Sequence, residues 1–166
     1  MMISKKMETK LNAQIKEEYN SEWIYRSMAY ALEGMNLSVF GQWFHKQADE
    51  EASHAQKIAK YVLNQGGAVK LGELPAPKSD WKSVEEICET AVKHEIHITE
   101  CINKLWDEAH KESDKATLSM LNWFVDEQVE EVATTTQLLE MVKLAKTPGQ
   151  IMMLEGRVWR MVQERS

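Results

Sequence analysis

A stretch of 70 residues, 78–147, contains neither glycine nor proline. The three prolines of the chain, Pro75, Pro77 and Pro148, all lie just outside it. Glycine and proline are the residues that a helix interior tolerates least, so a stretch without either is typical of long helices. Because helices in globular proteins rarely approach this length, we expect two helices here.

Apolar residues recur at alternating spacings of three and four in four segments, which is the pattern of helices that bury one face in a bundle. We predict helices over 5–33, 38–65, 83–111 and 114–145. A fifth and shorter amphipathic segment, 149–163, follows Pro148. Four helices already close a core, so we expect the apolar side of the fifth to pack against something else, such as a neighbouring subunit. That side carries Ile151, Leu154, Val158 and Val162.

The segment 66–82 contains three of the seven glycines and two of the three prolines. At about 3.3 Å per residue it is long enough to run the full length of a bundle, whereas the other two joins can only reverse the chain direction. The sequence therefore predicts an all-α, single-domain chain (1–166). Its fold is a four-helix bundle of two helical hairpins, with one long crossover between helices 2 and 3 and a short fifth C-terminal helix.

Charge and composition narrow the possible functions. The 20 Lys and Arg residues against 26 Asp and Glu give a net charge of −6, which argues against nucleic-acid or anionic-membrane binding. No window approaches the roughly 18 apolar residues of a membrane span, and no secretory signal is apparent, so we expect a cytoplasmic protein. Cys88 and Cys101 would lie roughly 20 Å apart on one helix, too far to form a disulfide.

Polar residues interrupt the apolar stripe of every long predicted helix. Several carboxylates buried together would cost several kcal/mol each unless a positive charge lay among them, and one histidine is not enough. A divalent metal meets this need, and oxygen-rich ligands with one imidazole suit iron or manganese better than structural zinc. The interrupting residues are Glu18, then Glu51 with His54, then Glu95, then Gln128 with Glu131.

The spacing of these residues supports one shared site. Side chains at i and i+3 lie on one helix face, so Glu51 and His54 can reach the same ion. The chain also repeats itself at an offset of 77: Glu18 is echoed by Glu95, and the run 49–54 is echoed by 126–131. Two hairpins related in this way would bring all four groups to one point in the bundle.

At these motifs the chain resembles the haem-free ferritins of bacteria and archaea, within the ferritin-like di-iron carboxylate family. The resemblance extends from Leu11-Asn12 to the fifth helix. It rests on Glu18 followed seven residues later by Tyr25, on Ala48-Asp49-Glu50-Glu51-Ala52-Ser53-His54-Ala55, on Lys93-His94-Glu95, and on Trp123-Phe124-Val125-Asp126-Glu127-Gln128-Val129-Glu130-Glu131.

The resemblance implies a di-iron ferroxidase centre. One iron would be held by Glu18, His54 and a bridging Glu51, and the other by Glu51, Glu95 and Glu131. Gln128 would lie beside the pair as a hydrogen-bonding or weak ligand, and Tyr25 would hydrogen-bond a ligand carboxylate. A third iron site would use Glu50, Glu127 and Glu130 and share Glu131.

The activity that the resemblance implies is oxidation of Fe(II) by O2 or H2O2, followed by storage of Fe(III) as a mineral. It further implies a hollow homo-oligomer of 24 subunits, with the fifth helix lining the four-fold axes. Haem is not expected, because Ala52 occupies the place where bacterioferritins have a haem-ligating methionine. Leu118 and Leu121 match the positions of two acids that line the three-fold channels of animal ferritins. Entry of iron by such an acidic channel is therefore not supported.

Two other readings share part of this pattern. A rubrerythrin-like di-iron oxidoreductase or peroxidase would have the same bundle, but the chain has no Cys-x-x-Cys module. A DNA-coating mini-ferritin commonly carries a basic tail, which Lys5-Lys6 is too sparse to supply. We expect the six tryptophans, and Met152-Met153, to serve packing. We expect surface or supporting roles for the remaining histidines, of which His94 and His97 share a helix face; they are His45, His94, His97 and His110.

Overall fold

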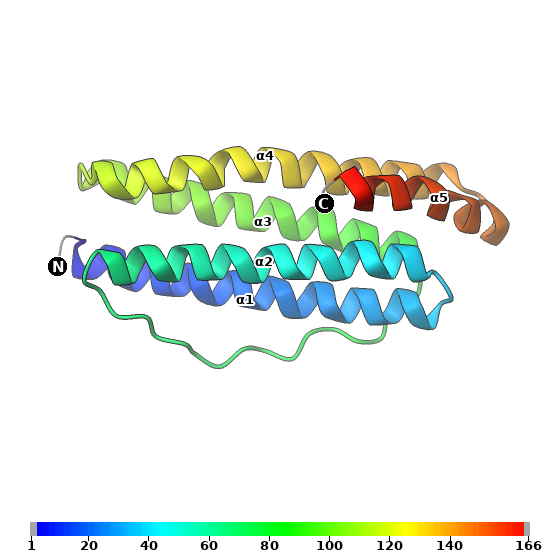
Figure 1. The fold of residues 1–166 in the computed structure, drawn as a ribbon, viewed down its shortest axis with the longest axis horizontal. Coiled ribbons are helices and arrows are strands. Elements are labelled where there is room, and N and C mark those ends of the chain that lie inside the picture. Colours follow the sequence, from blue (N-terminus) through cyan, green and yellow to red (C-terminus); the bar gives the residue numbers. More distant parts are fainter. Residues whose placement is uncertain (1–2, 165–166) are drawn as a thin grey trace.

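The computed structural model describes residues 3–164, which form five helices and no strand (Figure 1). Four long helices lie side by side, and a short fifth helix folds back along the bundle beside α4. This arrangement confirms the predicted fold class. The helices are α1 (Lys5–Gly34), α2 (Ser38–Asn64), α3 (Val84–Lys111), α4 (Lys115–Leu144) and α5 (Pro148–Glu164).

Three of the long helices begin at a side-chain cap. The oxygens of Ser4, Ser83 and Asp114 each accept a hydrogen bond from the backbone N–H three residues later, at 3.0–3.1 Å. Such caps satisfy N–H groups that have no partner within the helix. Helix α2 begins after Leu37, which provides no side-chain cap. Glu155 of α5 replaces it, because its carboxylate accepts from the N–H of Val39 at 2.7 Å.

The long crossover follows the outside of the bundle beside α1 (Figure 1). Asn12 anchors its beginning, since its side chain donates to the carbonyl of Ala68 at 2.9 Å and accepts from the N–H of Lys70 at 2.6 Å. Trp81 anchors its end by donating to Ser27 Oγ at 3.1 Å. The two hairpins therefore lie parallel, with the crossover returning the chain to the end at which α2 began.

The buried core consists of two apolar clusters. The α5-side cluster lies near the α1–α2 turn and includes Phe40, Phe44, Ile87, Leu138 and Val158. The N-terminal cluster lies near the α3–α4 turn and includes Met7, Leu11, Ile58, Ile102 and Leu121. Along each long helix, residues of one cluster give way to residues of the other near the middle of the helix. A layer of buried polar side chains separates the two clusters at that level.

The apolar side of α5 packs on its own chain, so our expectation of another partner for this face is wrong. Val158 is fully buried, Val162 is 8% exposed, and Ile151 and Leu154 pack against the same cluster. Helix α5 contacts α2 and α4, and these residues cover the side of the α5-side cluster that lies between those two helices.

Some residues that we expected to serve packing are exposed in the described chain. They include Met152 and Met153 on the outer side of α5, which are 62% and 81% exposed. Of the tryptophans, Trp43 is buried, whereas Trp23, Trp123 and Trp159 are 38–54% exposed. Neither cysteine forms a disulfide. No helix among residues 3–164 is long and apolar enough to cross a bilayer.

The cap from α5 generates a stability prediction. Replacing Glu155 by alanine should lower the free energy of unfolding by about 1 kcal/mol, because the first N–H groups of α2 lose their acceptor and the positive end of the helix dipole loses a nearby charge. Urea denaturation followed by circular dichroism measures the change. Glu164→Ala, an exposed change on the same helix, is the control. Equal midpoints for Glu155→Ala and the parent would contradict the capping role.

Candidate metal centre

Six side chains predicted from the sequence meet in the polar layer between the two apolar clusters. All four long helices contribute, and none of the six is more than 3% exposed. Each lies on the apolar stripe of its helix, so the packing that buries the stripe also carries the polar group into the core. The six are Glu18 from α1, Glu51 and His54 from α2, Glu95 from α3, and Gln128 and Glu131 from α4.

Glu18, Glu51 and His54 form the tightest group of possible ligands. One atom from each lies within 4.8 Å of the other two, and His54 Nδ1 is 3.6 Å from Glu51 Oε2. Glu18 Oε2 and Glu51 Oε2 are buried without a hydrogen-bond partner. An unpaired buried carboxylate oxygen costs several kcal/mol. Two such oxygens beside one imidazole therefore favour a cation at this position.

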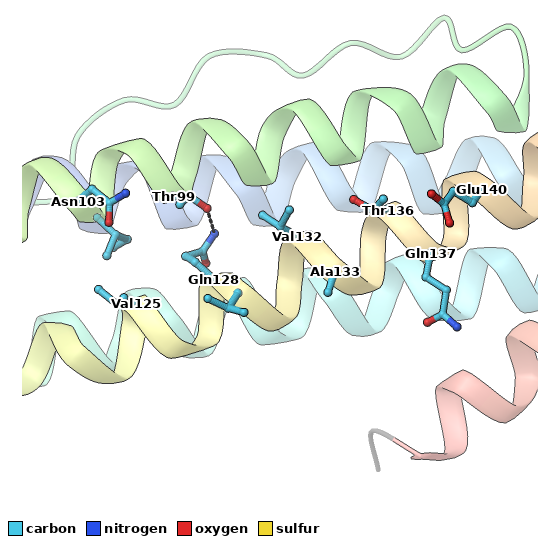
Figure 2. Close-up of a pocket in the computed structure, with 11 residues that line it drawn as sticks. Thr99, Asn103, Val125, Gln128, Val132, Ala133, Thr136, Gln137 and Glu140 are labelled. Atoms are coloured by element: carbon cyan, nitrogen blue, oxygen red, sulfur yellow. Dashed lines mark hydrogen bonds between the residues drawn. The ribbon is translucent and has the colours of Figure 1, made fainter.

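Glu95 on α3 is held from two sides. The hydroxyl of Tyr25 donates to Glu95 Oε1, and Gln128 Nε2 donates to Glu95 Oε2 at 3.1 Å. Gln128 also donates to Thr99 Oγ1 at 3.3 Å, and Figure 2 shows this contact at the edge of a groove of about 590 Å³ between α3 and α4. The expected contacts of Tyr25 and Gln128 with a predicted ligand are therefore present.

Sequence reasoning missed two glutamines that orient predicted ligands. Gln14 donates to Glu18 Oε1 at 2.9 Å, and Gln47 donates to Glu131 Oε2 at 2.7 Å. Both glutamines are at least 95% buried, and each lies four residues before a predicted ligand. A buried amide one turn before a ligand is the signal that could have identified them. Gln14 leaves the other oxygen of Glu18, Oε2, available to a metal.

Burial disfavours the charged form of these acids. Desolvation, and then the charge of Glu51, raises the pKa of Glu18 well above its usual range. Desolvation and then the charge of Glu95 do the same to the pKa of Glu51. Burial raises the pKa of Glu95 to about 7, although the hydrogen bond from Tyr25 opposes the shift. A divalent cation among these groups would reverse the shifts by favouring the carboxylates.

The three acids predicted for a third metal site lie at the edge of the layer. Glu50 and Glu127 are half-buried, and Glu130 is exposed. Glu50 is near enough to Glu51 for its charge to raise the pKa of that carboxyl. Among residues 3–164, no group containing Glu50, Glu127 or Glu130 has three possible ligand atoms within 4.8 Å of one another. The third site therefore stays a prediction.

The shifted pKa of Glu95 generates a pH-dependent prediction. A folded pKa of about 7 against an ordinary 4.5 means that the folded chain binds the extra proton between these values, so the stability from this group is lost as pH rises from 4.5 through 7. Replacing Glu95 by glutamine should therefore raise the unfolding free energy of the metal-free protein at pH 8, by on the order of 1–3 kcal/mol, and have little effect at pH 5.

Urea titrations of the parent and Glu95→Gln at both pH values measure this difference. Buried His94, with a pKa lowered to about 4, makes both proteins gain stability between pH 4 and 6.5, and the comparison cancels this contribution. A difference between the two proteins that does not grow with pH would show that Glu95 is not destabilised by its charge.

Comparisons with known proteins agree on one family. Residues 8–145 match the model of the ferritin-like domain. The chain is 36% identical to a bacterial non-haem ferritin of Bacteroides fragilis over 148 residues, which cover 89% of this chain and 93% of that protein. It is also 36% identical over 133 residues to a bacterial non-haem ferritin of Staphylococcus haemolyticus, covering 80% of each.

Solved structures agree with the sequence matches. The fold matches an open-pore ferritin of the hyperthermophilic archaeon Archaeoglobus fulgidus with a TM-score of 0.93 and 35% identity, covering 95% of this chain and 97% of that one. It matches a humanized archaeal ferritin with a TM-score of 0.92 and 34% identity, covering 95% and 96%. With its four-helix fold and carboxylate layer, the chain therefore belongs to the ferritin family, as a prokaryotic haem-free ferritin.

Proposed function

We propose that this ferritin stores iron, and that it oxidises Fe(II) with O2 or H2O2 at the buried carboxylate layer before Fe(III) is deposited as a mineral inside a protein cage. The observation that carries the proposal is the pair of buried oxygens, Glu18 Oε2 and Glu51 Oε2, which have no hydrogen-bond donor and lie beside His54. The names of its relatives as non-haem ferritins support iron as the metal.

Each predicted ligand has a role in this proposal. Glu18, His54 and Glu51 hold one Fe(II), and Glu51, Glu95 and Glu131 hold the second. Gln14 and Gln47 fix the carboxylates of Glu18 and Glu131 by their hydrogen bonds, and Glu18 Oε2 stays available for iron. Tyr25 and Gln128 orient Glu95 by donating to its two carboxylate oxygens.

The chemistry follows from charge and proximity. Each Fe(II) gives one electron, so two ions held together supply the two electrons that reduce O2 to H2O2, or H2O2 to water. Carboxylates stabilise Fe(III) more than Fe(II), because the interaction grows with the charge of the ion. The surrounding apolar clusters keep bulk water out of the layer. Oxidation is thus favoured without any residue serving as a covalent nucleophile.

Glu50, Glu127 and Glu130 are proposed to take iron that leaves this pair, sharing Glu131 as a third site. They connect the buried layer to solvent, since exposure increases from Glu131 to Glu127 and then to Glu130. This gradient suits the transfer of a product toward a mineral. We place the protein in the cytoplasm, with no nucleic acid, membrane or haem as partner.

The cage is proposed to be a homo-oligomer of 24 subunits. The outer side of α5 supports an assembled state, because Met152, Met153 and Trp159 leave a large apolar area exposed on the single chain. This side is distinct from the face of α5 that closes the core.

One combined measurement tests storage. Size-exclusion chromatography with mass determination is followed by anaerobic Fe(II) addition, then air, with absorbance recording Fe(III). We expect a particle near 24 times 19.2 kDa that oxidises two Fe(II) per chain quickly and then takes up hundreds more into a soluble core. A dimer that oxidises two per chain and stops would overturn storage in favour of a rubrerythrin-like oxidoreductase.

A substitution tests the site itself. Glu51→Ala should abolish the fast phase of Fe(II) oxidation while leaving the assembled particle unchanged, because both irons lose the ligand they share. Stopped-flow absorbance measures the phase. Glu73→Ala, an exposed change in the crossover, is the matched control and should keep the parent rate. Fast oxidation by Glu51→Ala at the parent rate would refute the assignment of the centre.

A further inference from the structure

Three side chains of types that can bind metal ions lie together on the surface between α1 and α3, outside the carboxylate layer. They are Glu17 of α1 with His97 and Cys101 of α3. The side chains of Glu17 and His97 are 38% and 54% exposed, and Cys101 is half-buried. None belongs to the proposed centre or its hydrogen-bonding partners. Because α1 and α3 pack together, two helices present a carboxylate, an imidazole and a thiol at one place.

Two of the three distances in this group, both from His97, match those between ligands of one metal ion. Glu17 Oε2 and Cys101 Sγ each lie 3.6 Å from His97 Nε2. With bonds of about 2.1 Å to nitrogen or oxygen and 2.3 Å to sulfur, two ligand atoms on a tetrahedral ion lie roughly 3.4–3.6 Å apart. His97 therefore holds both partners at the required separation. Glu17 Oε2 and Cys101 Sγ lie more than 4.8 Å apart in this conformation, so the partly exposed carboxylate of Glu17 has to rotate about its side-chain bonds to close the set.

A hydrogen-bond chain fixes the two helices at this point. Ser21 Oγ donates to the carbonyl of Glu17 at 3.0 Å, which uses its only proton. The contact of 2.7 Å between Ser21 Oγ and His94 Nε2 is consequently a donation from His94. The His94 ring lies 6.4 Å from that of His97 on the same helix face. Glu17 is thus connected to α3 through Ser21 and His94, one turn from His97.

We propose that Glu17, His97 and Cys101 form a second metal site, separate from the carboxylate layer, for a divalent cation of the zinc class. The donor set selects this class: thiolate with imidazole favours borderline-soft ions such as Zn²⁺ and Co²⁺, whereas the carboxylate layer favours harder ions. Water completes the coordination on the solvent side.

Binding exchanges a proton for the metal. Burial raises the pKa of the Cys101 thiol, and the charges of Glu17 and Glu18 raise it further, although Lys104 opposes them. The free thiol is therefore protonated at neutral pH. When M²⁺ binds, the S–H bond breaks, the sulfur–metal bond forms and the proton goes to solvent. The nearby carboxylates that disfavour the bare thiolate attract the incoming cation.

Co²⁺ is the probe, because a cobalt–thiolate bond gives a charge-transfer band in the near ultraviolet that carboxylate and imidazole ligands do not give. Reduced protein is titrated anaerobically with CoCl2. We expect a band that saturates at one Co²⁺ per chain and is bleached when Zn²⁺ is added. Cys101→Ser should abolish the band, and His97→Ala should weaken Co²⁺ binding by about tenfold or more.

Matched variants separate this site from the rest of the chain. Cys88→Ser changes the other cysteine, which is 1% exposed, and should keep the band. His110→Ala should keep it too, and keeps the test valid if Cys88→Ser does not fold. Glu51→Ala should also keep it, so the result does not depend on the proposed iron chemistry. No thiolate band in the parent, or an unchanged band in Cys101→Ser, would overturn the proposal.

Discussion

The structure depends on burying several carboxyl groups in one layer without a permanent positive charge. His54 is the single basic side chain among the six that meet there, and four of the other five are glutamates. Donors on the surrounding helices satisfy part of this layer: Gln14, Tyr25, Gln47 and Gln128 each point a proton at a carboxylate oxygen. Two carboxylate oxygens, Glu18 Oε2 and Glu51 Oε2, have no hydrogen-bond partner, and these are the ones available to a cation.

This layer also explains why the core is divided. An apolar core running the full length of four helices would be more stable than one interrupted by acids, because each buried charged group costs free energy. The two apolar clusters on either side supply the stability that the layer lacks and hold its side chains at fixed separations. The surface group of Glu17, His97 and Cys101 lies beyond this core, where solvent reduces the cost of its charges. A single bundle can therefore present two donor sets of different hardness.

The fold was accessible from the sequence because its signals are local. The stretch 78–147 without glycine or proline, the apolar periodicity and the glycine- and proline-rich segment 66–82 specify helices and their connections. The predicted ligands were accessible because they interrupt that periodicity and repeat at an offset of 77. Gln14 and Gln47 lack the repeat, since Ala91 and Phe124 occupy the corresponding places in the second half. The position of α5 could not be predicted, because an apolar stripe does not specify which surface it covers.

The cap that Glu155 gives to α2 connects two parts of the chain that are made at very different times. Glu155 follows its partner Val39 by 116 residues. On the ribosome, the first turn of α2 is therefore synthesised long before the carboxylate that completes it. Helix α2 carries Glu51 and His54, so the segment that brings two ligands to the layer is finished only when the last helix has docked. The metal centre is therefore completed late in the folding of the chain, after α5 has been synthesised.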